Sequence, residues 1–447
     1  MKRRITFILI IFIVLLLGMI NKVDARYIFK QEIILTNVNI EIPTGVFAKL
    51  YDCDSDGTGE TLVLNNTPAF SYSGTLISDY DNKNHKDIGA YKQCSWYSNA
   101  SNIKEVYVLN EIKPNTIAYW FYGMSSLSKV TNASKINTIN VTSMESTFSM
   151  CSSLTTLDVS SWNTSNVTNM SSMFFVCGSL PSLNVGNWNV GNVTNMRDMF
   201  LGCDSITTLN VTNWDVKNVT NMSEMFETCR NLTTLDVSNW NISKVTNLGS
   251  MFMLCESLTN IDVSNWNTSN VTNFGSLFSN CKALTSLNVA NFDTSKAINV
   301  SGVFASCSLL TSVDVSRWNT SNVTNMSNLF EKCIGMNTIN VTNFDTSNVK
   351  NMSFMFEGCT QITTLDINNF NTSNVTNMQC MFQNDTSLKT IYVSTNFVTT
   401  NVTNSSEMFT NSSQLVGGNG TTYRYSYRDK TYARIDRTMI PGYFTEK

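Results

Sequence analysis

Histidine, proline and charged residues are scarce in this chain of 447 residues, which has one histidine, five prolines and 14% charged residues. The single histidine, His85, excludes a histidine pair and a multi-histidine metal site. Lys and Arg total 30 against 33 Asp and Glu, so the basic surface typical of a nucleic-acid binder is not expected. We therefore expect no enzyme activity, no cofactor, no metal and no nucleic-acid partner.

Residues 1–25 have the pattern of a secretory signal peptide. Lys2, Arg3 and Arg4 precede an apolar run from Ile5 to Ile20, and Ala25 closes a small-residue cleavage site. The run is shorter than the roughly 20 residues that span a bilayer, which favours cleavage over an uncleaved anchor. We expect a secreted chain without a membrane span, and any attachment to the cell surface to be non-covalent.

A 26-residue period dominates the rest of the chain. One aromatic series follows it exactly: Trp162, Trp188, Trp214, Trp240, Trp266, Phe292, Trp318, Phe344 and Phe370. Cysteine repeats with the same spacing from Cys151 to Cys359, and phenylalanine does so from Phe148 to Phe382. Coils that bury an apolar edge only by stacking on their neighbours produce such a period. The sequence predicts a solenoid of about twelve coils.

Within one unit, residues 154–179, apolar side chains recur at about every third position, and only Leu157, Asp158 and Val159 alternate as in a strand. This pattern predicts a short parallel strand per coil with an irregular or short helical opposite side. The LxxLxVxxW opening and the MFxxC closing resemble the leucine-rich repeat of BspA-like bacterial surface proteins, in a 26-residue variant. The segments 111–124 and 429–445 also resemble that family's flanks. The resemblance implies an extracellular adhesion or host-interaction protein without catalytic residues.

Four regions follow from these patterns: the signal peptide at 1–25, a β-rich N-terminal domain at 26–114, the solenoid at 115–415 and a C-terminal capping hairpin at 416–447. Strand-like pieces occur at 27–42, 45–52, 60–66 and 105–112. Asp52, Asp54, Asp56 and Gly57 match the start of a calcium loop, but position twelve is Val63, so a hairpin turn is preferred. Cys53 and Cys94 are a candidate disulfide.

Each repeated column has a structural interpretation. We expect the aromatic columns to form the core and the cysteine column to be buried thiols, because nine parallel inward side chains cannot pair completely. Asn169 and its equivalents are predicted to form ladders, with left-handed backbone, bonds to their own backbone and amide-to-amide hydrogen bonds. Cys380 is expected to face outward.

Two surfaces are candidate binding sites. The residues flanking the predicted strands turn outward and form a possible ligand face: Thr156, Asp158, Ser160, Thr208, Asn210, Thr234, Asp236, Asp262, Asp314 and Asp366. A basic-aromatic group lies in the tail: Arg424, Tyr425, Tyr427, Arg428 and Arg434. The leading hypothesis is a secreted or surface-associated adhesion protein that binds an extracellular protein or polysaccharide. The alternative is a rigid envelope spacer without a specific ligand.

Overall fold

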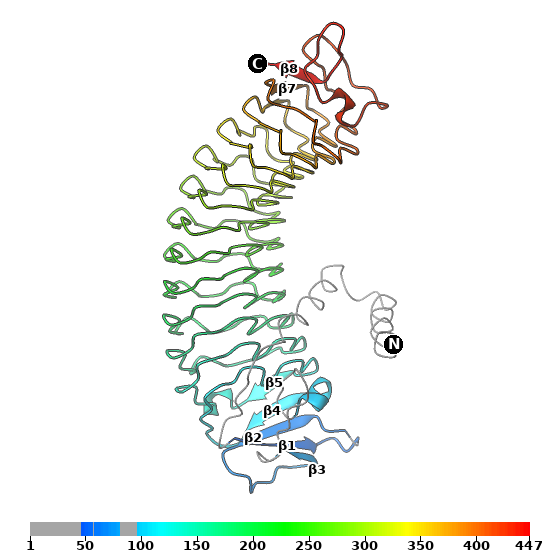
Figure 1. The fold of residues 1–447 in the computed structure, drawn as a ribbon. Helices are drawn as coiled ribbons and strands as arrows, with labels where there is room; N and C mark the ends of the chain where they lie inside the picture. The colour runs from blue at the N-terminus through cyan, green and yellow to red at the C-terminus, as the bar shows by residue number, and fades with distance from the viewer. Residues whose placement is uncertain (1–45, 57, 81–95) are drawn as a thin grey trace.

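The computed structural model describes residues 46–56, 58–80 and 96–447, so the signal peptide, Cys94 and the segment 27–42 lie outside the described residues. Stacked coils form an elongated, curved solenoid with a small sheet at its N-terminal end (Figure 1). None of the helices within the described ranges is long and apolar enough to cross a membrane.

The N-terminal sheet joins a hairpin to the first coils. It contains β1 (Phe47–Asp52), β2 (Thr61–Asn65), β3 (Thr75–Tyr80), β4 (Glu105–Val108) and β5 (Lys129–Thr131), in the order β3-β1-β2-β4-β5. β1 pairs antiparallel with β2 and β3, whereas β2, β4 and β5 are parallel. Strands predicted at 45–52, 60–66 and 105–112 are therefore present, and β3 was missed. Two short 3-10 helices, η2 (Tyr97–Asn102) and η3 (Ala133–Lys135), follow β3 and β5.

The prediction of a strand in every coil is wrong for most of the solenoid. Between β5 and β6 (Thr364–Asp366), the described coils are joined by isolated parallel bridges, such as Thr208 to Thr234 and Asn169 to Asn195. The backbone turns too often for a continuous strand, since bonds such as Trp162 N to Val159 O at 3.1 Å close four-residue turns. The opposite side of each coil consists of turns, in agreement with the irregular alternative of the prediction.

The aromatic columns form the core, as predicted. Phe148 stacks on Phe174 with ring centroids 5.7 Å apart, and Trp188 stacks on Trp214 at 6.4 Å. The buried indoles also donate hydrogen bonds to the preceding coil, for example from Trp188 Nε1 to Val159 O at 3.2 Å. Each tryptophan of the column therefore satisfies its polar atom while its ring fills the interior.

The cysteine column is buried and unpaired. All nine thiols from Cys151 to Cys359 are free, and Cys177 Sγ donates to Phe148 O at 3.1 Å in the pattern that its equivalents repeat. Burial raises the pKa of every thiol in the column. The outward orientation expected for Cys380 is wrong, because this residue is only 5% exposed.

Left-handed backbone occurs in each coil, but not at the ladder asparagines. It lies three and seven residues after them, as at Ser172 (φ 54°) and Val176 (φ 57°). Between these corners alternate residues bond forward to the next coil, as Phe174 N does to Met199 O at 2.9 Å. The asparagines instead accept from their own chain, as Asn169 Oδ1 does from Ser171 N at 3.0 Å.

The C-terminal end closes differently from the expected hairpin. β7 (Thr390–Val393) lies between β6 and β8 (Phe444–Glu446), and all three are parallel. Phe444 packs edge-on against Phe382 and Phe409 at the end of the phenylalanine column. A last 3-10 helix, η4 (Lys430–Tyr432), precedes this strand. The tail therefore extends the solenoid sheet by one strand and covers its open end.

Candidate functional site

The possible ligand face consists of Thr156, Asp158, Ser160 and their equivalents in later coils, and we call it the polar face. Most of its residues are exposed, including Thr208 and Asp236, whereas Ser160 is half-buried. Asp366 differs because it is half-buried and its carboxylate pairs with Lys447 Nζ. The polar face thus runs along the middle coils and ends where the tail packs on the last ones.

The aspartates of the polar face bond first to their own chain. Asp158 Oδ1 accepts hydrogen bonds from Ser160 Oγ at 2.6 Å and from Ser160 N at 3.0 Å. Hydrogen bonds from the serine hydroxyl and amide lower the pKa of Asp158, and the same cause lowers it at Asp236 and Asp262. These carboxylates are therefore ionised at neutral pH and fixed in orientation, which suits hydrogen bonding to a ligand better than acid-base catalysis.

A shallow groove that the sequence did not predict follows the asparagine ladder. It has a volume of about 240 Å³ and is lined by Asn247, Gly249, Asn273, Gly275 and Asn299 together with neighbouring serines and Glu224. Other coils have serine, glutamate, arginine or glutamine where this region has Gly249 and Gly275. The loss of two side chains in successive coils is the sequence signal that could have identified the groove.

The basic and aromatic residues predicted as a tail site do not form one cluster. The Arg428 guanidinium lies 4.5 Å from the ring centroid of Tyr425, which is 66% exposed, and 3.2 Å from Glu407 Oε1. Tyr427 instead stacks on Tyr432 at 4.2 Å. Arg434 lies over the Tyr432 ring and donates from Nε to Pro441 O at 2.9 Å. Arg424 and Tyr425 are therefore the tail residues most available to a ligand.

The turn between β1 and β2 gathers acidic side chains. Atoms of Asp52, Asp54, Asp56 and Glu60 that could serve as ligands all lie within 4.8 Å of one another. The hairpin predicted here is confirmed by the antiparallel pairing of β1 and β2. Cys53 is exposed and donates from Sγ to Ser73 O at 3.1 Å, while its candidate disulfide partner, Cys94, lies outside the described residues.

Solved structures that are similar to this chain include two leucine-rich bacterial proteins. A leucine rich cell surface protein from Faecalibacterium prausnitzii shares 17% identity, with 80% of this chain and 96% of that chain covered and a TM-score of 0.40. A leucine-rich repeat protein from Eubacterium ventriosum shares 16% identity, with 82% and 93% covered and a TM-score of 0.41. No curated protein matches the chain.

The family comparison covers the solenoid in three overlapping stretches, residues 115–233, 202–313 and 300–419. The matching family is described as "Mycoplasma protein of unknown function, DUF285". Since these stretches together span more than half of the sequence, the chain belongs to the DUF285 family.

Proposed function

We propose that this protein is a secreted or surface-associated solenoid that binds an extended extracellular polymer, a polysaccharide or a protein segment, through its polar face. The observation that carries the proposal is the repetition of small exposed hydrogen-bonding groups at the same place in successive coils, such as Thr208 and Thr234. A polymer with its own repeat can meet these groups many times.

The energetics favour many weak contacts. Each net hydrogen bond contributes about 1 kcal/mol, and linked contacts raise the overall affinity well beyond that of one contact. A single strong anchor is not available on this face, because its columns hold Thr, Ser, Asp and Asn rather than the Trp, Tyr or Arg typical of hot spots. We therefore expect recognition of a repetitive ligand and no catalytic turnover.

The alternative is a rigid spacer without a specific ligand. The hydrogen bonds within the polar face favour it, because Asp158, Asp236 and Asp262 already accept from their own serines. Stacked aromatic columns and ladder bonds also make a stiff rod, which is the property that a spacer needs.

One binding experiment separates these functions. The mature protein, residues 26–447, is applied to an array of matrix proteins and polysaccharides beside a rod variant (Thr208→Arg with Thr234→Arg) and a tail variant (Arg424→Ala with Tyr425→Ala). The tail variant uses point substitutions because the tail packs on the last coils, so removing it would expose the end of the core. Saturable binding lost only in the rod variant supports the proposal. Loss only in the tail variant moves the site to the tail, and no binding by any protein favours the spacer.

Localisation is tested separately, by immunodetection in the medium, on intact cells and in the cytoplasm of the producing organism. The proposal expects the protein outside the cytoplasm, with a size that matches removal of residues 1–25. Detection in the cytoplasm alone would contradict it.

A further inference from the structure

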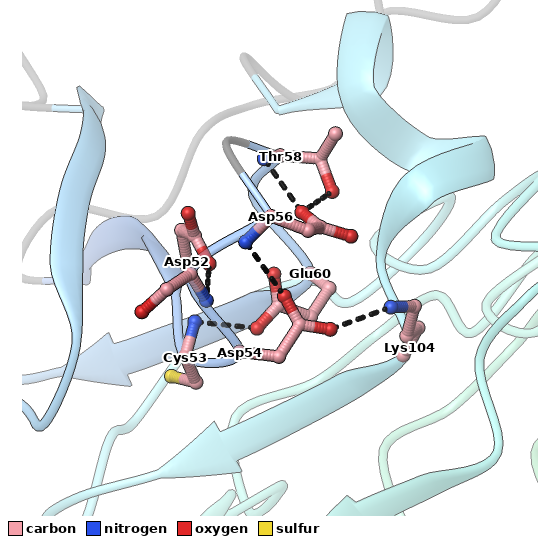
Figure 2. A network of polar contacts seen from close by, with 8 residues as sticks. Asp52, Cys53, Asp54, Asp56, Thr58, Glu60 and Lys104 are labelled. Atoms are coloured by element: carbon pink, nitrogen blue, oxygen red, sulfur yellow. Dashed lines mark hydrogen bonds and ion pairs between the residues drawn. The ribbon is translucent and has the colours of Figure 1, made fainter.

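The turn between β1 and β2 brings together four carboxylates, which belong to Asp52, Asp54, Asp56 and Glu60. Asp52 is the last residue of β1, and Glu60 directly precedes β2. Figure 2 shows the carboxyl group of Glu60 between those of Asp52 and Asp54, with Asp56 beside them. Their oxygens lie within 4.8 Å of one another.

Glu60 distinguishes this cluster from a group of surface carboxylates. The residue is 5% exposed, and its Oε1 accepts a hydrogen bond from Cys53 N at 2.5 Å. Its Oε2 is also buried but accepts no hydrogen bond from any described residue. A buried carboxylate oxygen without a partner is costly, because it has lost water without gaining a compensating interaction. A bound cation between the carboxylates would provide that interaction.

We propose that Asp52, Asp54, Asp56 and Glu60 bind one divalent cation, and that the ion is Ca²⁺. All four candidate ligands are carboxylate oxygens, which hard cations prefer. Ca²⁺ takes oxygens at roughly 2.3–2.6 Å, so oxygens on opposite sides of the ion lie about 4.6–5.2 Å apart. The four candidate ligand oxygens all lie within 4.8 Å of one another, which is close enough for them to share one Ca²⁺ ion. Mg²⁺ usually keeps several of its own waters and is seldom bound by a cage of protein carboxylates, so Ca²⁺ suits the cluster better.

Zn²⁺ fits the cluster less well. Its common protein ligands are thiolates and imidazoles, and the neighbouring Cys53 thiol is directed to Ser73 O instead. The remaining Ca²⁺ coordination positions would be filled by water and backbone oxygens, as is usual for this ion.

Local contacts are compatible with ion entry. Lys104 Nζ lies 3.2 Å from Asp54 Oδ2, but both side chains are about half exposed, so the lysine can move away at little cost. Asp56 Oδ1 accepts from Thr58 N at 2.8 Å and from Thr58 Oγ1 at 2.6 Å, which fixes its carboxylate in the turn.

The proposed Ca²⁺ site differs from the expectation from sequence that the chain binds no metal. That expectation required an acid twelve residues into the loop, where Val63 is fully buried in β2. In the hairpin, Glu60 N bonds to Tyr51 O at 3.1 Å, which brings the Glu60 side chain back to the beginning of the turn. Glu60 therefore takes the place of the missing acid.

The test is Ca²⁺ binding by the full mature protein, freed of metal with a chelator and followed by equilibrium dialysis and isothermal titration calorimetry. We expect one site with a Kd of roughly 0.1–1 mM, the range of extracellular calcium modules. Glu60→Gln keeps the shape and an acceptor for Cys53 N but removes the charge, and it should weaken binding at least tenfold. Asp79→Asn, which changes an exposed acid on β3 of the same sheet, should leave binding unchanged.

Several results would overturn the proposal: no binding by the wild-type protein at 10-fold the expected Kd, equal binding by wild type and Glu60→Gln, or tighter binding of Mg²⁺ than of Ca²⁺. If Glu60→Gln fails to fold, Asp54→Asn provides the same comparison, because Asp54 is exposed and lies in the turn. Loss of binding in Asp54→Asn supports the site, and unchanged binding contradicts it. Thermal unfolding of each variant without Ca²⁺ separates weak binding from poor folding.

Discussion

A Cβ atom at Gly275 would lie 2.5 Å from Asn299 Nδ2, the atom that donates to Asn273 Oδ1 at 2.9 Å. Gly249 has the same relationship with Asn273, whose amide donates to Asn247 Oδ1 at 2.9 Å. The amide-to-amide ladder predicted from sequence therefore exists over Asn247, Asn273 and Asn299, where glycine leaves room for it. In other coils the amide finds different partners, such as Glu145 Oε2 for Asn169.

Gly275→Ser should consequently break the bond between Asn299 and Asn273. We expect a loss of about 1 kcal/mol in the free energy of unfolding, the usual net value of one hydrogen bond. Urea denaturation followed by tryptophan fluorescence measures it. Gly191→Ser is the matched control, because Ser165 and Ser243 occupy the equivalent position and the nearest contact of a Cβ there is 3.2 Å. Equal stability of the two variants would show that the ladder bond contributes nothing.

Trp266→Ala should destabilise the middle of the solenoid by about 3–5 kcal/mol, the usual cost of removing a buried aromatic side chain. Trp266 is 2% exposed and stacks on Phe292 at 6.5 Å, and its Nε1 donates to Val237 O at 3.2 Å. Trp266→Phe, which copies the residue of the next coil, removes mainly the indole hydrogen bond and should cost about 1 kcal/mol. Chemical denaturation compares both with the wild-type protein, and a neutral Trp266→Ala would refute the core assignment.

The columns could be predicted from sequence because an exact period places identical residues in identical surroundings. Trp162 and Phe148 are buried for the same reason as every later copy, so one repeat describes the whole core. The backbone between the columns could not be predicted in the same way. Val176 has a φ of 57°, a conformation that β-branched residues avoid, and its N donates to Leu201 O of the next coil at 2.6 Å.

Some features of the candidate sites could also be predicted from sequence, and others could not. Thr156 and Asp158 were correctly placed outward by the alternation around Leu157. The groove at Gly249 and Gly275 depends on two absent side chains in successive coils, and the role of Glu60 depends on the register of a hairpin. The groove could have been found from the two glycines one period apart, but the role of Glu60 could not, because it requires knowing that the start of β2 lies beside the end of β1.

Thiol reactivity should divide the cysteines into two groups. In the native protein Cys53 is exposed, while the column from Cys151 to Cys359 and Cys380 are buried. Burial also raises the pKa of Cys307 to about 12 and of Cys380 to about 11, so little reactive thiolate forms at neutral pH. Of the described cysteines, we expect only Cys53 to be alkylated without denaturant.

Mass spectrometry after alkylation measures this difference. Denaturing conditions should add labels at all nine column positions and at Cys380, and Cys53→Ser should remove the native label from the described residues. Missing labels in the denatured protein would mean that column thiols are cross-linked, which would contradict their assignment as buried small hydrophobic residues.

Asp385 should make the stability of the last coils depend on pH. This residue follows Cys359 by 26 positions, so a carboxylate stands where the column predicts a thiol. It is fully buried, and its Oδ1 accepts from Cys359 N at 2.8 Å. Burial raises its pKa well above the ordinary value. The folded state therefore prefers the protonated acid.

Because the folded state prefers protonated Asp385, the protein should lose stability as pH rises. A raised pKa in the folded state contributes stability that is fully present below the unfolded value, about pH 4, and is lost as pH rises through the folded value. Asp385→Asn keeps the shape and the acceptor for Cys359 N but cannot ionise, so it should unfold at a higher temperature than the wild type at neutral pH. Thermal melts between about pH 4 and pH 8 should show this advantage shrinking toward the acid end. An advantage that stays constant with pH would mean that Asp385 is not protonated in the folded protein.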